Sequence, residues 1–312
     1  MQRTRATALA KEAAWPALPL AEWQATRDTL HMWTQVAGKV RLALAPRVNH
    51  WWQATLYTSV RGLTTSPIPA ESGTFEIEFD FIAHVLRIET SWGQSRMKPL
   101  APQTVAEFYE NLMAMLESLG IQVNIWPMPV EVPNPVRFDR DAVHKSYDPD
   151  YANRFWRVLT SVDAIFKEFR SRFIGKASPV HFFWGSFDLA ASRFSGRRAP
   201  ERPGADRVTN EAYSHEVISG GWWPGGGDIK EPMFYAYAAP QPDGFGKAPV
   251  LPAHAFYDVQ LGEFLLPYEA VRTAENPSQT LLDFLQSTYE AGANLGKWDR
   301  AALERSEWSA LA

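Results

Sequence analysis

Residues 74–90 read TFEIEFDFIAHVLRIET, and this stretch gives the clearest indication of fold class in the chain. Its apolar residues alternate with acidic ones, which is the period of a strand with one buried face. A turn near Ala83-His84 leads into a second alternating run at 86–90, so the stretch predicts an antiparallel hairpin. The apolar positions of the first strand are Phe75, Ile77, Phe79 and Phe81.

Helical periodicity marks four other segments. Residues 104–119 carry one apolar stripe that ends at Gly120, and residues 149–173 carry a longer one. Residues 21–37 also read as a helix, which we expect Gly38 to end. The fourth predicted helix covers 278–292. The remaining alternating or short apolar runs predict strands at 40–44, 52–60, 123–126, 179–185, 187–194, 212–218, 233–238 and 263–266.

This order of elements predicts an α+β fold with mainly antiparallel β-sheets covered by helices. The strands follow one another through connections too short for helical crossovers, and parallel pairing needs such crossovers. Many aromatic residues occur in the chain, with 13 Trp, 18 Phe and 10 Tyr, so we expect a large aromatic core.

A proline-rich segment, PMPVEVPNP at 127–135, is the best candidate for a boundary. We therefore expect a first α+β half at 15–135 and a second at 136–300, packed together as one unit. Residues 1–14 and 301–312 are expected to be tails, the first of them mobile.

The two halves run through a similar order of elements, which suggests the hypothesis of an internal duplication of a helix–strands–helix unit. The segment from His50 (HWWQATLYTSVRG) aligns without a gap on the segment from His181 (HFFWGSFDLAASR). Each follows a helix with a Gly-Lys pair, at Gly38-Lys39 and Gly175-Lys176. Duplication and chance similarity of two strand patterns both account for the match.

Composition excludes several classes of site. The 312 residues include no cysteine, which rules out disulfides, thiolate metal sites and cysteine nucleophiles, and fits a reducing compartment. A net charge of −4 argues against a nucleic-acid binder, and no segment predicts a signal peptide or membrane span. We expect a cytoplasmic protein. The basic stretch 193–207 reads as a solvated loop, with a phosphate-binding patch as the alternative.

Standard cofactor and catalytic motifs are absent. The GGGD string at 225–228 lacks the spacing of a dinucleotide loop, and Gly175-Lys176 lacks the upstream glycine of a phosphate loop. There is no HExxH and no GxSxG. The seven histidines show no ligand spacing, so we expect no metal and no cofactor.

Two segments combine polar and aromatic residues in a way that suggests a site. In SPVHFFWGSFDLAASRFSGR at 178–197, an extended chain would place Trp184, Ser186 and Asp188 on one face. In EAYSHEV at 211–217, His215 lies beside Glu216 and could act in acid–base chemistry. Asp188 could instead form a structural ion pair with Arg193, and His215 could be a hydrogen-bonded core histidine.

The strings GKVRLAL, WWPGGG and LLDFLQSTYEA, together with the two segments above, resemble a bacterial family known as domain of unknown function 5996. The resemblance spans about residues 15–300. It implies a stand-alone bacterial protein, and it carries no activity, ligand or catalytic residue to this chain.

We therefore expect a small-molecule-binding protein, with enzymatic activity an open question, whose aromatic-lined cleft lies in the second half. The alternative is a non-catalytic binding or scaffolding protein in which the same rings form a subunit interface. The sequence does not indicate an oligomeric state. Candidate catalytic residues are His181, Asp188, Arg193, His215 and Glu216. Candidate ligand-binding residues are Trp184, Ser186, Arg197, Trp222, Trp223, Tyr235 and Tyr237.

Overall fold

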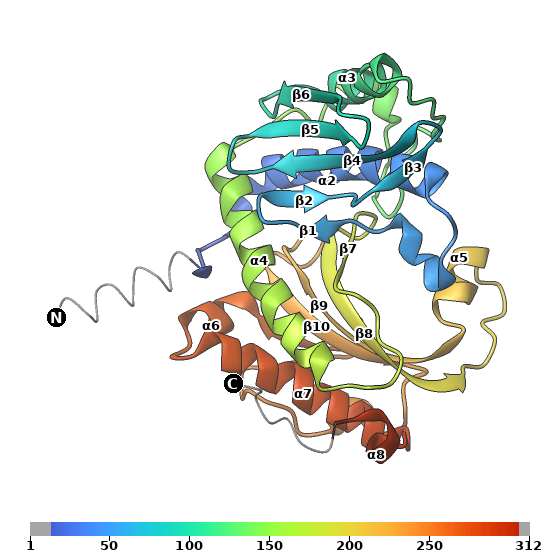
Figure 1. The fold of residues 1–312 in the computed structure, drawn as a ribbon. Helices are drawn as coiled ribbons and strands as arrows, with labels where there is room; N and C mark the ends of the chain where they lie inside the picture. Colours follow the sequence, from blue (N-terminus) through green and yellow to red (C-terminus); the bar gives the residue numbers. More distant parts are fainter. Residues whose placement is uncertain (1–13, 306–312) are drawn as a thin grey trace, which may run out of the picture. The chain divides into compact units, whose positions relative to one another are not determined.

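A computed structural model describes residues 14–305, and the expected tails fall largely outside this range. It contains two antiparallel sheets with helices, which confirms the predicted α+β class (Figure 1). The chain forms two compact units, each built from several segments. Among the described residues, unit 1 comprises 14–48, 52–160 and 182–188, and unit 2 comprises 49–51, 161–181 and 189–305. The proline-rich segment 127–135 therefore lies within unit 1.

The first sheet belongs to unit 1 and has the order β1-β2-β4-β5-β6, with β3 also paired to β4. The predicted hairpin is confirmed as β4 and β5, in register from Phe75 opposite Thr90 to Asp80 opposite Val85. The strands are β1 (Tyr57–Thr58), β2 (Gly62–Thr64), β3 (Ile68–Ala70), β4 (Gly73–Asp80), β5 (Val85–Thr90) and β6 (Ser95–Pro99).

Helices α2 (Leu20–Leu44) and α3 (Val105–Ser118) pack against this sheet (Figure 1). Phe108 of α3 stacks on Trp33 of α2 and on Phe79 of β4, so one aromatic cluster joins the three elements. Helix α3 begins with a capping box between Thr104 and Glu107, which satisfies free backbone N–H groups at its start. The predicted helix at 104–119 is thus confirmed.

Helix α2 corrects two predictions. It continues through Gly38 to Leu44, so the predicted end at Gly38 and the predicted strand at 40–44 are wrong.

The predicted strand at 52–60 is also mostly wrong, because residues Asn49–Ala54 form the short helix η1. Residues 123–126 are irregular and form no strand.

The second sheet has the order β11-β12-β10-β9-β8-β7. Gly220 of β9 lies against Leu285 of α7, and Gly292 of α7 lies against Ile218, so small residues let this helix pack close to the sheet. The strands are β7 (His181–Phe183), β8 (Asp188–Arg198), β9 (His215–Trp223), β10 (Met233–Ala239), β11 (Phe256–Asp258) and β12 (Glu263–Pro267).

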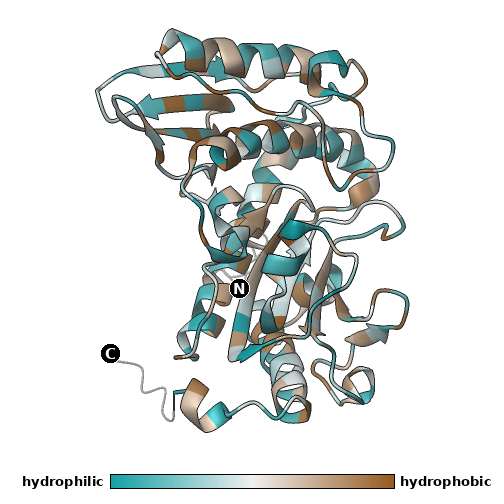
Figure 2. Cartoon of the chain, turned by 90° about the vertical axis from the view of Figure 1, so that its right-hand side faces the viewer, coloured by the Kyte–Doolittle hydropathy of each residue, from teal (hydrophilic) through white to brown (hydrophobic). Residues whose placement is uncertain are grey.

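The remaining helices include α4 (Pro149–Ser171), which contributes residues to both units, and α7 (Pro277–Leu295). Both were predicted from their apolar stripes, and Figure 2 shows hydrophobic and hydrophilic residues alternating along the helices and strands. The short ones are η2 (Phe138–Arg140), α5 (Arg207–Ala212), η3 (Phe245–Lys247), α6 (Tyr268–Thr273) and α8 (Arg300–Leu303).

The internal duplication stays an unconfirmed prediction. The segment from His50 forms a short helix, whereas the segment from His181 forms a strand, so the gapless alignment pairs unlike structures. The second sheet also places β12 between β10 and β11, while the first follows chain order apart from β3.

Candidate functional site

The predicted site residues around 184–188 lie on a turn of unit 1. The chain turns at residues 184–187, Phe187 has φ 61°, and Asp188 opens β8. The prediction that Trp184, Ser186 and Asp188 share a face of one extended strand is therefore wrong. The alternation of apolar residues in the sequence does not reveal this chain turn. The turn depends on the left-handed backbone conformation of Phe187, which few residues other than glycine adopt.

Helix α2 holds this turn in place. Nε2 of His31 lies 2.8 Å from the carbonyl oxygen of Gly185, so Nε2 carries the proton and donates it. Burial and then the charge of Arg27 lower the pKa of His31 to about 3, so the ring is neutral at physiological pH. Further along α2, Gly38 lies under the ring of Trp184, whose Nε1 donates to the carbonyl oxygen of Ala54.

A strained residue, Glu131, faces the same turn. Gln35 of α2 both donates to and accepts from the backbone of Val130, at 2.9 Å each, and fixes the chain where Glu131 has φ 56°. The carboxylate of Glu131 lies directly against the Cα of Gly185, where a Cβ would overlap it. Left-handed residues other than glycine cost energy and concentrate at functional sites.

Two carboxyl groups meet here. Burial and then the charge of Asp188 raise the pKa of Glu131. Asp188 is buried and accepts a hydrogen bond from the hydroxyl of Ser186. The negative charge of Asp188 thus opposes the ionisation of Glu131, a relation that also occurs between the two acids of general acid–base pairs.

A second cluster lies in unit 2 and contains basic groups. Nζ of Lys176 lies 2.6 Å from Nε2 of His50, and Nδ1 of His50 lies 3.0 Å from the carbonyl oxygen of Ala212. The ammonium donates to Nε2 and the ring donates through Nδ1, so this tautomer of His50 is neutral. The ring of His50 also packs on Phe194, with centroids 4.7 Å apart.

The predicted residue His215 completes this cluster. Its ring lies edge-on to that of His50, with centroids 5.9 Å apart, and its Nδ1 lies 3.0 Å from the hydroxyl oxygen of Ser214. Burial, then the charges of Lys176 and Arg198, lower the pKa of His215. Burial, then Lys176 and His215, lower the pKa of His50 against the opposing effect of the Ala212 carbonyl. We call His50, Lys176, Arg198 and His215 the basic cluster.

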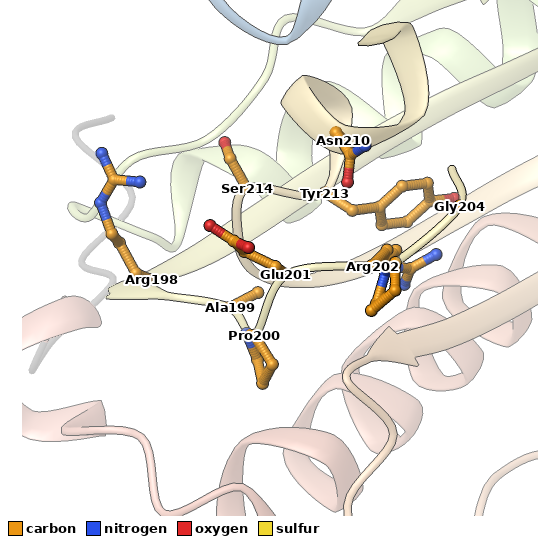
Figure 3. Close-up of a pocket in the computed structure, with 10 residues that line it drawn as sticks. Arg198, Ala199, Pro200, Glu201, Arg202, Gly204, Asn210, Tyr213 and Ser214 are labelled. Atoms are coloured by element: carbon orange, nitrogen blue, oxygen red, sulfur yellow. The ribbon is translucent and has the colours of Figure 1, made fainter. Parts of the chain in front are cut away.

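A pocket of about 470 Å³ shares Arg198 with the basic cluster (Figure 3). The guanidinium carbon of Arg202 lies 4.0 Å from the ring centre of Tyr213, which gives the pocket a flat wall. Asn210 and Ser214 supply polar groups, and Glu201 supplies one carboxylate. The complete lining is Arg198, Ala199, Pro200, Glu201, Arg202, Pro203, Gly204, Asn210, Tyr213 and Ser214.

Arg193 lies among aromatic rings of unit 2. Its guanidinium carbon is 3.4 Å from the ring centre of Phe169 and 4.3 Å from that of Tyr289, and it donates to the Phe169 carbonyl. Burial lowers its pKa to about 9. Among residues 14–305 no carboxylate lies within ion-pair distance of it. The expected Asp188–Arg193 pair is not formed. The two residues are five positions apart on β8, and side chains an odd number of positions apart on a strand point to opposite faces.

Arg197 and Glu216 form an ion pair, with the guanidinium 2.6 Å from Oε2 of Glu216. Arg197 also donates to the carbonyl oxygens of Gly296 and Lys297. Gly296 and Lys297 directly follow the last residue of α7, so Arg197 holds the chain where that helix ends. Both side chains are thus occupied by structural contacts.

The predicted aromatic residues divide between the two faces of β9 and β10. Trp222 is fully buried beside Tyr268. Trp223 lies on the other face, where the ring of Tyr235 covers Gly221 and stacks on that of Tyr237. The hydroxyl of Tyr237 lies 3.1 Å from that of Tyr213, which links this face to the pocket wall. His181 is buried at the start of β7.

The site residues predicted from the sequence do not include Lys39, Glu131, Lys176 or His50. Only weak signals marked them: Glu131 is the single charged residue of the proline-rich segment, and each lysine belongs to a Gly-Lys pair. Within residues 14–305 no three His, Asp or Glu side chains come together as metal ligands, and no helix is long and apolar enough to span a membrane.

Comparison with known proteins agrees with the resemblance seen in the sequence. No curated protein and no solved structure matches the chain. A family model matches residues 15–305, which is nearly all of the chain and includes both clusters. The chain therefore belongs to the family of unknown function DUF5996.

Proposed function

We propose that the protein binds a small anionic molecule in unit 2, in the pocket beside the basic cluster. The observation that carries this proposal is the gathering of four basic side chains beside the pocket, where charges within the cluster lower the pKa values of both histidines. Lys176 acts on both His50 and His215, and Arg198 acts on His215. A bound anion would lie beside the positive charges of Lys176 and Arg198, and Arg198 also lines the pocket.

The size and lining of the pocket fit such a ligand. A volume of 470 Å³ falls within the range of small-molecule sites, which pair flat apolar walls with a few placed polar groups. Tyr213 stacked by Arg202 is such a wall, and Asn210 and Ser214 are such polar groups. The carboxylate of Glu201 favours a ligand that also carries a hydrogen-bond donor.

A catalytic role would use the imidazole of His215. Its Nδ1 contacts the Ser214 hydroxyl within the basic cluster, and the lowered pKa favours the neutral ring, which can accept a proton. The alternative of a scaffold with an aromatic interface has less support. Trp126 and Phe256 are the only exposed tryptophan and phenylalanine among residues 14–305.

The first test is native mass spectrometry of protein purified without denaturation, to find a co-purified small molecule. The second is calorimetric titration with inorganic phosphate, citrate and an adenosine monophosphate at constant ionic strength. We expect saturable binding of at least one anion. Arg198→Ala and Arg202→Ala should each weaken it at least tenfold.

Arg140→Ala is the matched control, because Arg140 is exposed and belongs to unit 1. Binding that is unsaturable, or that survives both pocket substitutions unchanged, would contradict the proposal. The anion that binds best identifies the chemical class of the ligand.

A further inference from the structure

Lys39 of α2 is a buried lysine in unit 1, at 6% exposure. Its ammonium nitrogen lies 5.6 Å from the ring centre of Trp126 and 5.6 Å from that of Trp184. The faces of the two indoles attract a cation, and this attraction offsets part of the hydration free energy that the ammonium loses on burial. The ammonium is therefore held charged between two rings.

No acid neutralises this charge. In the part of the chain that the structure describes, no carboxylate lies within 4 Å of the Lys39 ammonium, and the ammonium donates no hydrogen bond to the protein. Burial alone lowers the pKa of Lys39. Buried charges are normally paired, and this ammonium has no charged partner among residues 14–305.

The two rings beside Lys39 differ in how they are held. Trp184 is 7% exposed, is anchored by its hydrogen bond to Ala54, and packs on Gly38. Trp126 lies in an irregular segment and is 67% exposed. Tryptophan is rarely left so open to water, and an exposed indole is a common surface for ligand recognition.

We propose that Lys39, Trp126 and Trp184 form a binding site for a small aromatic carboxylate. The ligand carboxylate would accept hydrogen bonds from the ammonium, and its flat apolar part would lie on the exposed ring of Trp126. A single ammonium matches a monoanion, whereas phosphate is commonly bound by several donors. The site belongs to unit 1 and does not depend on the pocket in unit 2.

The test is a titration followed by fluorine NMR of protein labelled with 5-fluorotryptophan, in which Trp126→Phe assigns the Trp126 resonance. Benzoate is the probe, and benzamide is its neutral analogue of the same shape. We expect benzoate to shift the Trp126 resonance to saturation at constant ionic strength and benzamide to cause no saturable shift. Lys39→Met should weaken benzoate binding at least tenfold.

Lys98→Met is the matched control, because Lys98 is an exposed lysine of unit 1 that bonds to Asn111. It should leave benzoate binding unchanged. If Lys39→Met does not fold, Trp126→Ala replaces it, since removal of an exposed ring should leave the fold intact and weaken benzoate binding at least tenfold by calorimetry. Three outcomes would overturn the proposal: no saturable shift, equal binding of benzamide, or tighter binding of inorganic phosphate at the same residues.

Discussion

Gly38 in the middle of α2 lies directly under the indole of Trp184, so closely that a Cβ at position 38 would overlap the ring. The two residues are 146 positions apart in the chain, and both belong to unit 1. The glycine therefore serves close packing rather than helix termination. Its contact also places the Trp184 indole near Lys39, the next residue of the helix.

Gly38→Ala should destabilise the protein although alanine is the better helix former. In an exposed helix this change would add up to about 1 kcal/mol of stability. Here the added methyl group meets a buried ring, and overpacking of this kind costs about 1–3 kcal/mol. Urea unfolding of the two proteins measures the difference. In the double variant with Trp184→Ala the alanine penalty should disappear, and an equal penalty in both backgrounds would contradict the packing explanation.

His31 should make unit 1 sensitive to acid. Its pKa of about 3 in the fold lies below the unfolded value of 6.5, so only the unfolded state takes up a proton between these limits. The stability due to the neutral ring is complete above pH 6.5 and is lost as the pH falls towards 3. From pH 6.5 to 4.5 the loss should be about 2 kcal/mol.

Carboxyl groups also titrate in this range, so the comparison is with His31→Gln, whose amide can still donate to the Gly185 carbonyl. The variant should lose less stability than the wild type between pH 6.5 and 4.5, as measured by urea unfolding at several pH values. Parallel pH profiles would show that His31 is not the acid-sensitive group.

Glu131→Gln should stabilise the protein in alkaline solution. The pKa of Glu131 is raised in the fold by burial and by Asp188, so the fold holds its proton to higher pH than the unfolded chain does. Stability falls as the pH rises through that interval. Glutamine removes the charge, so the melting temperature of the variant should exceed that of the wild type at pH 8.

The gain should be a few degrees at most, because the Glu131 residue is exposed and solvent screens its charge. At pH 4 the difference should vanish, since the wild-type group is then protonated too. Differential scanning calorimetry at both pH values provides the measurement. A lower melting temperature of Glu131→Gln at pH 8 would mean that the ionised carboxylate is stabilised by contacts of its own.

Lys176→Met should raise the pKa values of both His50 and His215. The charge of Lys176 lowers both, after the larger effect of burial, and methionine keeps the length of the side chain without the charge. Proton NMR titration of the two imidazoles measures the shifts, with Lys167→Met as control because Lys167 pairs with Asp163 on α4. Unchanged values in Lys176→Met would contradict the electrostatic coupling on which the anion proposal rests.

Arg193→Lys should weaken the fold without altering ligand binding. The guanidinium is 1% exposed and lies flat against Phe169 and Tyr289, contacts that a compact ammonium cannot reproduce. We expect a loss of about 2–3 kcal/mol in the free energy of unfolding, the range for disrupting a buried, hydrogen-bonded group. Wild-type stability of this variant, or loss of anion binding in a variant that is fully folded, would reject the structural role.

The sequence predicted those helices and strands whose buried face is visible in their own apolar pattern. The β4–β5 hairpin, the helices α3, α4 and α7, and the strands β10 and β12 lie close to their predicted ranges. Each buries one face along its length, so its apolar period is visible without knowledge of its neighbours. Of the predicted site residues, His215 follows Tyr213 and Ser214, which line the pocket, whereas Arg193, Arg197 and Glu216 are engaged in packing and ion pairing.

Tertiary structure alone decided how the remaining residues act. Helices commonly end at a glycine, yet α2 continues through Gly38, and the distant Trp184 fills the space above this residue. His50 and Lys176 meet although 126 residues separate them, and the backbone at Glu131 is held left-handed by Gln35 of another segment. Sequence periodicity records which face of an element is buried. It does not record which distant side chain fills that face, because this depends on how the whole chain closes.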